Sequence, residues 1–264
     1  MIDGRAIIDP RARIGNNVEI GPWTIVGADV EIGDGTHIAS HVVLKGPTRI
    51  GRNNRIYQFA TVGEDTPALA YGGEPTWLEI GDNNVIREGV TIHRGLVQDQ
   101  GRTIIGNHCL LMAYVHVGHD CVVGDHVIMA NNASIAGHVI VGEHANFGGY
   151  SGVAQFRRVG AHAHIAAMSL VIKDVPAYMT VAGNPANVIG LNLEGMRRRG
   201  FDKAVLQAVK DAHRLLYRSG LTASDAQAQI DRLAREFPAV AVLLDSVRDS
   251  RWGIVRPRTQ PDPE

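Results

Sequence analysis

The chain has 264 residues, of which 45% are hydrophobic and 20% are charged, and its formal net charge is −1. This balance is ordinary for a globular protein and provides no overall basic field for a nucleic-acid partner. No apolar run approaches the roughly 18 residues that a membrane-spanning helix needs. The first ten residues carry charges where a secretory signal needs an apolar core. We therefore expect a cytoplasmic protein with no membrane span.

A six-residue rhythm runs through most of the chain. Large apolar residues, aliphatic except for Phe147, recur at every sixth position from Ile14 to Val62, again from Ile80 to Ile92, and then from Ile105 to Val171. A small residue, often glycine, follows many of them. Neither a heptad nor a helical period of 3.6 fits this spacing. Six residues correspond to three alternations of a β-strand interrupted by a turn, so the pattern predicts short strands joined by regular corners.

Such a repeat predicts a coil with three flat sides. Each hexapeptide forms one short strand and one corner, and three of them, about 18 residues, complete one turn whose strands stack in parallel about 4.8 Å apart. We expect this parallel β-helix to occupy residues 1–186. The rhythm is interrupted at 64–79 and 95–103. We predict loops there, because insertions in repeat proteins often build the binding surface.

The two cysteines, Cys109 and Cys121, both occupy the small fifth position of a hexapeptide. They are twelve residues apart, so in a coil with three units per turn they lie on different faces and should not form a disulfide. We expect two reduced cysteines that act as small core residues, which fits a reducing compartment.

The repeat ends after Val175, and residues 187–256 have helical patterns. Asp202 is predicted to cap one helix, Thr222 and Asp225 to form a capping box for a second, and Pro238 to precede a third. This C-terminal helical domain should cover the open end of the coil, whose strand edges would otherwise promote aggregation. Residues 257–264 hold three prolines and are predicted to be disordered.

Histidines gather in the middle of the repeat. His119 stands beside Asp120, and histidine is a suitable general base for an alcohol because its ordinary pKa is near neutral, while a carboxylate can select its tautomer. His138 comes 19 residues later, at nearly the same place on the next turn, and His116 comes three residues earlier. The spacing predicts a patch of three imidazoles. The same histidines could instead form a zinc site or be unrelated surface residues.

Two further features are candidates for substrate contacts. Gly137 precedes His138, and a glycine allows its backbone N–H to approach the oxyanion of an acyl-transfer reaction closely. Residues 192–200 read NLEGMRRRG, with three consecutive arginines that are able to hold phosphates. A solvated basic run is the competing interpretation of this second motif.

Several runs of sequence, above all HVGHDCVVGD, NNASIAGHV and NLEGMRRRGF, resemble those of the UDP-N-acetylglucosamine O-acyltransferases. These are hexapeptide-repeat acyltransferases with left-handed coils. The resemblance implies transfer of a 3-hydroxyacyl chain from acyl carrier protein to the 3-hydroxyl of UDP-N-acetylglucosamine, the first step of lipid A biosynthesis. It also implies a homotrimer with active sites between adjacent subunits, and no cofactor or metal.

The resemblance assigns roles to individual residues. His119 is implied as the general base, Asp120 as the residue that orients it, and Gly137 as the oxyanion donor. The residues implied to bind substrates are His116, His138 and Gln155, with Asn192, Glu194 and Arg198 on the nucleotide and Ala167 on the floor of the acyl pocket.

The chain departs from the family pattern at three positions. It reads Ala68-Leu69-Ala70-Tyr71 where the family usually has Asp-Leu-Lys-Tyr, and Ala154 precedes Gln155 where the family usually has histidine. These differences leave open an acyltransferase for another nucleotide sugar or a 3-amino analogue. A zinc-dependent hydratase on the same coil and a binding scaffold without catalysis are two further hypotheses.

Overall fold

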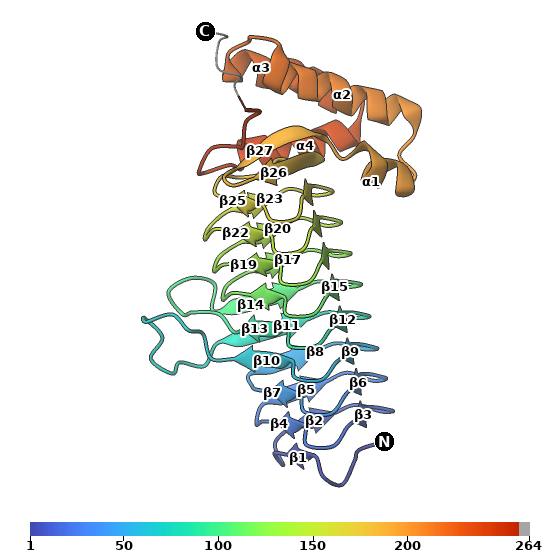
Figure 1. Cartoon of the computed structure of the whole chain (residues 1–264), viewed down its shortest axis with the longest axis vertical. Coiled ribbons are helices and arrows are strands. Elements are labelled where there is room, and N and C mark those ends of the chain that lie inside the picture. Colours follow the sequence, from blue (N-terminus) through green and yellow to red (C-terminus); the bar gives the residue numbers. More distant parts are fainter. Residues whose placement is uncertain (259–264) are drawn as a thin grey trace.

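The computed structural model describes residues 1–258, apart from the side chain of Ala223. The chain forms three sheets, which we call faces 1, 2 and 3, around one long coil, and the strands of the repeat pair in parallel in all three (Figure 1). Face 1 consists of β1 (Ile7–Ile8), β4 (Ile25–Val26), β7 (Val43–Leu44), β10 (Thr61–Glu64), β13 (Thr91–His93), β16 (His116–Val117), β19 (Ser134–Ile135), β22 (Gly152–Val153) and β25 (Leu170–Val171).

Faces 2 and 3 complete the triangle. Face 2 consists of β2 (Arg13–Ile14), β5 (Val30–Ile32), β8 (Thr48–Ile50), β11 (Trp77–Ile80), β14 (Arg102–Ile105), β17 (Val122–Val123), β20 (Ile140–Val141) and β23 (Arg158–Val159). Face 3 consists of β3 (Glu19–Ile20), β6 (His37–Ile38), β9 (Arg55–Ile56), β12 (Val85–Ile86), β15 (Leu110–Leu111), β18 (Ile128–Met129), β21 (Asn146–Phe147), β24 (His164–Ile165), β26 (Met179–Gly183) and β27 (Ala186–Leu191).

The aliphatic residue of each hexapeptide fills the interior, as predicted. Ile38, Leu111 and Ile135 have no exposed surface, because alternate residues of a strand point to opposite sides. The strands pair with a shift of one turn, so that His116 lies opposite Ser134 and Ile135 opposite Val153. Residues 18 apart are therefore neighbours on successive turns, which is the relation on which the predicted histidine patch depends.

The corners between the faces use left-handed backbone conformations. Asp120 has a φ of 57° and His138 one of 62°, in the region that asparagine, aspartate and histidine enter more often than most other non-glycine residues. Corner side chains stack on those of the next turn, as His126 does on His144 with ring centroids 4.6 Å apart. The abundance of histidine and aspartate at these positions therefore has a conformational cause as well as a chemical one.

Two loops leave the coil at mid-height on the same side of the molecule (Figure 1). Residues 65–76 connect β10 with β11, and residues 94–101 connect β13 with β14. The first lies within the predicted interruption of 64–79, and the second begins one residue before the predicted interruption of 95–103. The strands extend slightly further into the interruptions than expected, because β10 runs to Glu64 and β11 begins at Trp77.

The coil ends in a hairpin followed by helices. Strand β26 pairs in parallel with β24, and β27 returns antiparallel to it, so strands continue past residue 186 to Leu191. The helices are α1 (Leu193–Arg198), α2 (Lys203–Arg218), α3 (Ala223–Ala234) and α4 (Pro238–Arg248). In Figure 1 the hairpin and the helices lie over the end of the coil. Within the described residues no helix is long and apolar enough to cross a membrane.

The helix caps confirm the sequence prediction. The Asp202 carboxylate accepts the N–H of Val205 at 2.8 Å, and the Thr222 hydroxyl accepts that of Asp225 at 3.2 Å. Side chains of α4 join the core of the coil, and Val240 and Leu243 have no exposed surface. Of the tail predicted to be disordered, residues 259–264 lie outside the described part of the chain.

Cys109 and Cys121 are free and buried, as predicted. Burial raises the pKa of the Cys109 thiol to about 11 and that of Cys121 to about 12. Both remain protonated thiols at neutral pH, so they act as small core residues.

Candidate active site

His119 and Asp120 lie at the corner between faces 1 and 2, directly after β16. Nδ1 of His119 is 2.9 Å from Oδ2 of Asp120, and the two residues are 7% and 1% exposed. Neighbours on a strand point opposite ways, but the left-handed backbone of Asp120 lets its carboxylate meet the adjacent ring. An acidic partner at Nδ1 holds the proton there, which leaves Nε2 as the proton acceptor. The pair therefore has the arrangement of an oriented general base.

The Asp120 carboxylate is fixed by the loop of residues 94–101. The N–H of Leu96 donates to both carboxylate oxygens, at 2.9 and 3.1 Å. The backbone N–H of Asp120 donates to the Thr103 hydroxyl at 2.8 Å. The Gln100 amide donates to the Asp120 carbonyl at 2.9 Å. These bonds hold the carboxylate in the orientation that the His119 ring needs.

Gly137 lies one turn above His119. A methyl group on its Cα would stand 2.6 Å from both Nε2 and Cε1 of the His119 ring, closer than van der Waals contact permits. Gly137 has no left-handed φ, so the steric demand comes from the imidazole and not from its own backbone. Gln155, one turn further up the same corner, is exposed. Glycine at position 137 thus keeps the proton-accepting side of His119 open.

His138 stands beside the dyad, at the same corner. Its ring meets the His119 ring edge-on with centroids 4.8 Å apart, and it stacks on Phe156 at 4.4 Å. Its Nδ1 is 2.6 Å from a carboxylate oxygen of Asp99, which belongs to the loop of residues 94–101. The structure thus brings His138 into the patch that the 19-residue spacing predicted.

His116 precedes the same corner, on strand β16. Its Nδ1 is 2.8 Å from the Thr91 hydroxyl. Burial lowers the pKa of His116, and the neighbouring His93 and His119 lower it further. A depressed pKa favours the neutral ring, so His116 is suited to hydrogen bonding with a substrate without adding a positive charge beside the base.

A cavity of about 590 Å³ opens beside this patch. Its wall includes His138 and Phe156 from the corner, Leu96 and Asp99 from one loop, and Ala70 from the other. The loops that interrupt the repeat therefore build part of the cavity wall, as was predicted because insertions in repeat proteins often build the binding surface.

The same corner also has the donor atoms of a metal site. One ligand atom from each of His119, Asp120 and His138 lies within 4.8 Å of the others. Two imidazoles and a carboxylate form a donor set that zinc accepts. Metal analysis of the purified protein, together with activity after dialysis against a chelator, therefore separates a zinc enzyme from a metal-free acyltransferase.

The nucleotide residues implied by the resemblance lie elsewhere, in α1 and at its N-cap, beside face 3. Asn192 caps α1 by accepting the N–H of Gly195 at 3.1 Å, and its amide donates to the carbonyl of His162 at 2.9 Å. Glu194 and Arg198 form an ion pair at 3.0 Å. These residues border a second cavity, of about 550 Å³, together with Ile128, Asn146, Gly195, His164 and Arg199.

Within one chain the structure does not bring all the candidate residues together. Face 3 is the side of the triangle opposite the corner that carries His119, so Glu194 and Arg198 are separated from the base by the width of the coil. Ala167 is exposed at the corner between faces 3 and 1, the other edge of face 1 from His119. One chain thus presents three separate parts of a site.

Comparison with known proteins shows how this chain is related. A family model described as UDP-N-acetylglucosamine O-acyltransferase, domain 2, matches residues 174–255, and a hexapeptide-transferase model matches 11–46 and 102–137. The acyl-[acyl-carrier-protein]–UDP-N-acetylglucosamine O-acyltransferase of Stutzerimonas stutzeri is 57% identical over 97% of this chain and 99% of its own. That of Azotobacter vinelandii is 55% identical over the same shares. The chain belongs to the UDP-N-acetylglucosamine O-acyltransferase family.

Solved structures of this family agree. The Moraxella catarrhalis enzyme has a TM-score of 0.95 and 49% identity, and the Acinetobacter baumannii protein has a TM-score of 0.94 and 51% identity. Both alignments cover 97% of this chain and 99% of the other. The likeness confirms the predicted fold, a left-handed parallel β-helix with C-terminal helices.

The departures from the family pattern occupy distinct places in this acyltransferase. Ala70 lines the cavity beside His138, whereas Ala68 is half-buried and is not among the residues of its wall. Ala154 is half-buried and lies before Gln155 at the catalytic corner. Two of the three altered positions, Ala70 and Ala154, are therefore next to the patch that carries the base.

The partners of the dyad were not found by sequence reasoning. Leu96 and Thr103 act on Asp120 through a backbone N–H and a hydroxyl, and Asp99 reaches His138 from a loop. Almost any residue type has a backbone N–H, so a backbone donor cannot be recognised from the sequence, and the loop lacks the six-residue repeat that would place its side chains. The only available signal was the position of the interruption, between two turns that carry histidines.

Proposed function

We propose that this chain transfers a 3-hydroxyacyl group from acyl carrier protein to the 3-hydroxyl of UDP-N-acetylglucosamine, the first step of lipid A biosynthesis. The observation that carries the proposal is the buried His119–Asp120 pair facing Gly137, in a chain 57% identical over 97% of its length to a named acyltransferase. The free thiols of Cys109 and Cys121 suit a reducing compartment, so we place the reaction in the cytoplasm.

The mechanism follows from the orientation of the base. Nε2 of His119 takes the proton of the sugar 3-hydroxyl while the oxygen attacks the thioester carbonyl. The Gly137 N–H donates to no other group of residues 1–258, so it is available to the oxyanion of the tetrahedral intermediate. When the intermediate collapses, the carbon–sulfur bond breaks and the imidazolium returns its proton to the thiolate of the carrier. Asp120 stabilises the imidazolium between these two steps.

The proposal is tested by a turnover assay with purified protein, 3-hydroxyacyl carrier protein and UDP-N-acetylglucosamine, with the product identified by mass spectrometry. A 3-amino analogue and other nucleotide sugars form the comparison panel. The expected result is transfer to UDP-N-acetylglucosamine that persists after dialysis against a chelator. A required equivalent of zinc with no acyl transfer would instead support the hydratase. No turnover with any acceptor in the panel would support the scaffold.

We infer that the active unit is a homotrimer. The base lies at the corner between faces 1 and 2, while Glu194 and Arg198 lie in α1 beside face 3, so a second copy is needed to place them together. Closed threefold symmetry suits a coil with flat sides. We expect light scattering at micromolar concentration to give three times the mass of one chain. A monomer that retains full activity would contradict a site shared between subunits.

The length of the acyl chain should depend on Ala167. The position is exposed at the edge of face 1, beside the left-handed corner residue Met168. Replacing alanine by glycine removes one methyl group, and a change of this size in an apolar pocket alters preference by about 1–3 kcal/mol. We expect Ala167→Gly to shift the preference towards longer 3-hydroxyacyl chains in competition assays. An unchanged ratio would place the floor of the acyl pocket at another residue.

A lysine at position 70 should strengthen binding of the nucleotide sugar. Ala70 lines the cavity beside His138, where a lysine ammonium would reach a diphosphate oxygen. A charge-assisted contact contributes about 1.5–3 kcal/mol, so we expect KM to fall by about ten- to a hundredfold in Ala70→Lys, with kcat less affected. Leu69→Lys, which adds the same charge at a fully exposed neighbour, is the matched control. A KM equally lowered in both variants would indicate non-specific attraction.

A further inference from the structure

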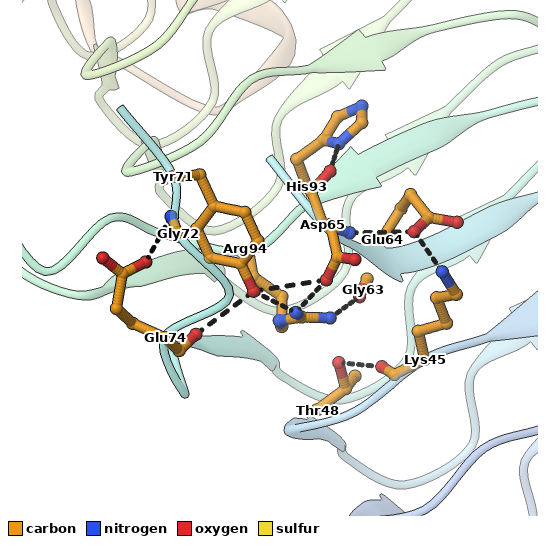
Figure 2. Close-up of polar contacts among 10 residues, drawn as sticks. All are labelled: Lys45, Thr48, Gly63, Glu64, Asp65, Tyr71, Gly72, Glu74, His93 and Arg94. Carbon is orange, nitrogen blue, oxygen red and sulfur yellow. Dashed lines mark hydrogen bonds and ion pairs between the residues drawn. The ribbon is translucent and has the colours of Figure 1, made fainter. Parts of the chain in front are cut away.

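Arg94 is a buried arginine at the junction of the two loops. It directly follows β13 and is only 4% exposed. Its Nη1 donates to the carbonyl of Gly63 at 2.6 Å, and its Nη2 forms an ion pair with Asp65 (Figure 2). A buried guanidinium is costly unless it is paired and hydrogen-bonded, and here both terminal nitrogens have partners, while Nε has none among the described residues.

The loop of residues 65–76 is fastened to this guanidinium. Nη2 of Arg94 also donates to the Tyr71 hydroxyl at 2.8 Å, and that hydroxyl is 3.1 Å from the carbonyl of Glu74. Figure 2 shows Asp65 and Tyr71 converging on Arg94 from two parts of the loop. Tyr71 directly follows Ala70, the residue that this loop contributes to the cavity beside His138. Through its bond to Tyr71, Arg94 therefore holds Ala70, the adjacent residue of the loop, in the cavity wall.

The root of the loop, Glu64 and Asp65 at the end of β10, is held by further contacts. The Glu64 carboxylate accepts hydrogen bonds from the Lys45 ammonium at 2.5 Å and from the N–H of Asp65 at 3.0 Å. The Glu64 carbonyl accepts one from the N–H of Arg94 at 3.1 Å. His93 is 2.7 Å from the Asp65 carbonyl through Nδ1. The loop is thus anchored at its start by several groups. Further along the loop, the Tyr71 hydroxyl contacts Arg94, the Asp65 carboxylate at 3.3 Å and the Glu74 carbonyl.

The chain that follows Arg94 supports the catalytic pair. Leu96 donates to the Asp120 carboxylate through its backbone N–H, and Asp99 contacts His138. The segment 94–101 thus contains both Arg94, whose guanidinium binds loop 65–76, and Leu96, whose N–H fixes the Asp120 carboxylate. The Leu96 bond is made by the backbone, so it does not require the Arg94 side chain.

We propose that Arg94 is a positioning residue for acceptor binding: its guanidinium fixes loop 65–76 against the segment 94–101, and so sets the cavity wall that contains Ala70. The inference rests on the proposed acyl transfer to a nucleotide sugar. It predicts that loss of the guanidinium fork raises KM for the acceptor, while kcat changes less because the His119–Asp120 pair and its Leu96 bond remain. An ordinary loss of stability would not separate the two constants.

The test uses the full chain with Arg94→Lys and, as a milder change, Tyr71→Phe, which removes only the hydroxyl. Lysine keeps the charge but cannot reach Gly63, Asp65 and Tyr71 together. We expect KM for UDP-N-acetylglucosamine to rise about 10- to 100-fold in Arg94→Lys and less in Tyr71→Phe. The control is Arg102→Lys, at a half-exposed arginine of β14 that pairs with Glu79 at 3.5 Å. It should leave KM and kcat unchanged.

Hydrogen–deuterium exchange without substrate provides a readout that does not depend on activity. Peptides covering residues 65–76 should exchange faster in Arg94→Lys and in Tyr71→Phe than in the wild type and in Arg102→Lys. Unchanged exchange in both variants would overturn the proposal, and so would a fall in kcat alone. If Arg94→Lys does not fold, Tyr71→Phe decides by the same criteria. Faster loop exchange in a protein that transfers no acyl group would overturn the proposed function and retain the anchoring role.

Discussion

Replacement of His119 by alanine is expected to lower the rate of acyl transfer by about 10²- to 10⁴-fold, the usual contribution of a general base. The imidazole is the group whose Nε2 faces Gly137, and Asp120 holds it in place from the other side at 2.9 Å. Its removal leaves the oxyanion donor and the substrate contacts intact, so KM should change much less than kcat.

The measurement is steady-state kinetics with acyl carrier protein and UDP-N-acetylglucosamine, beside a thermal melt and light scattering. The matched control is His126→Ala, a histidine at the corner between faces 2 and 3, away from the cavity. His126→Ala should keep wild-type rates. A His119→Ala enzyme with more than about a tenth of the wild-type rate would exclude His119 as the base.

Gly137→Ala is expected to reduce kcat by about 10²-fold, although alanine retains the backbone N–H. The added methyl would lie 2.6 Å from Nε2 of His119, so the imidazole has to move away from the position in which it receives the proton. Displacement of a catalytic group by about 1 Å is enough for a loss of this size. The effect therefore separates steric positioning of the base from loss of the oxyanion donor.

The control for this variant is Gly4→Ala, near the other end of the coil, where an added methyl meets nothing within 4 Å. It should have wild-type kinetics and stability. If Gly137→Ala transfers acyl groups at the wild-type rate, the His119 ring has room to shift without loss of function, and the close approach is not part of the mechanism. In the double variant with His119→Ala we expect little further loss beyond His119→Ala alone, whereas independent effects would add and lower the rate by about another 10²-fold.

The sequence by itself determined the coil and the neighbours along each corner. A strand that alternates inside and outside and turns after six residues is specified locally, and three such units bring residues 18 apart together. His119, Gly137 and Gln155 follow from this relation, as do Asp120, His138 and Phe156 one position later. The helix caps at Asp202 and Thr222 were also predictable, because each depends on a side chain and a backbone N–H three residues apart.

Only the tertiary structure decided how the loops return to the coil. The bonds from Leu96 to Asp120 and from Asp99 to His138 span 24 and 39 residues, across a segment with no repeat that would fix its path. The same is true of Arg94, whose partners lie in β10 and in the loop of residues 65–76. The separation of the base from Glu194 and Arg198 likewise depended on which face the chain reached after its last turn. These relations arise from packing between distant segments, and a local pattern of residue types carries no information about them.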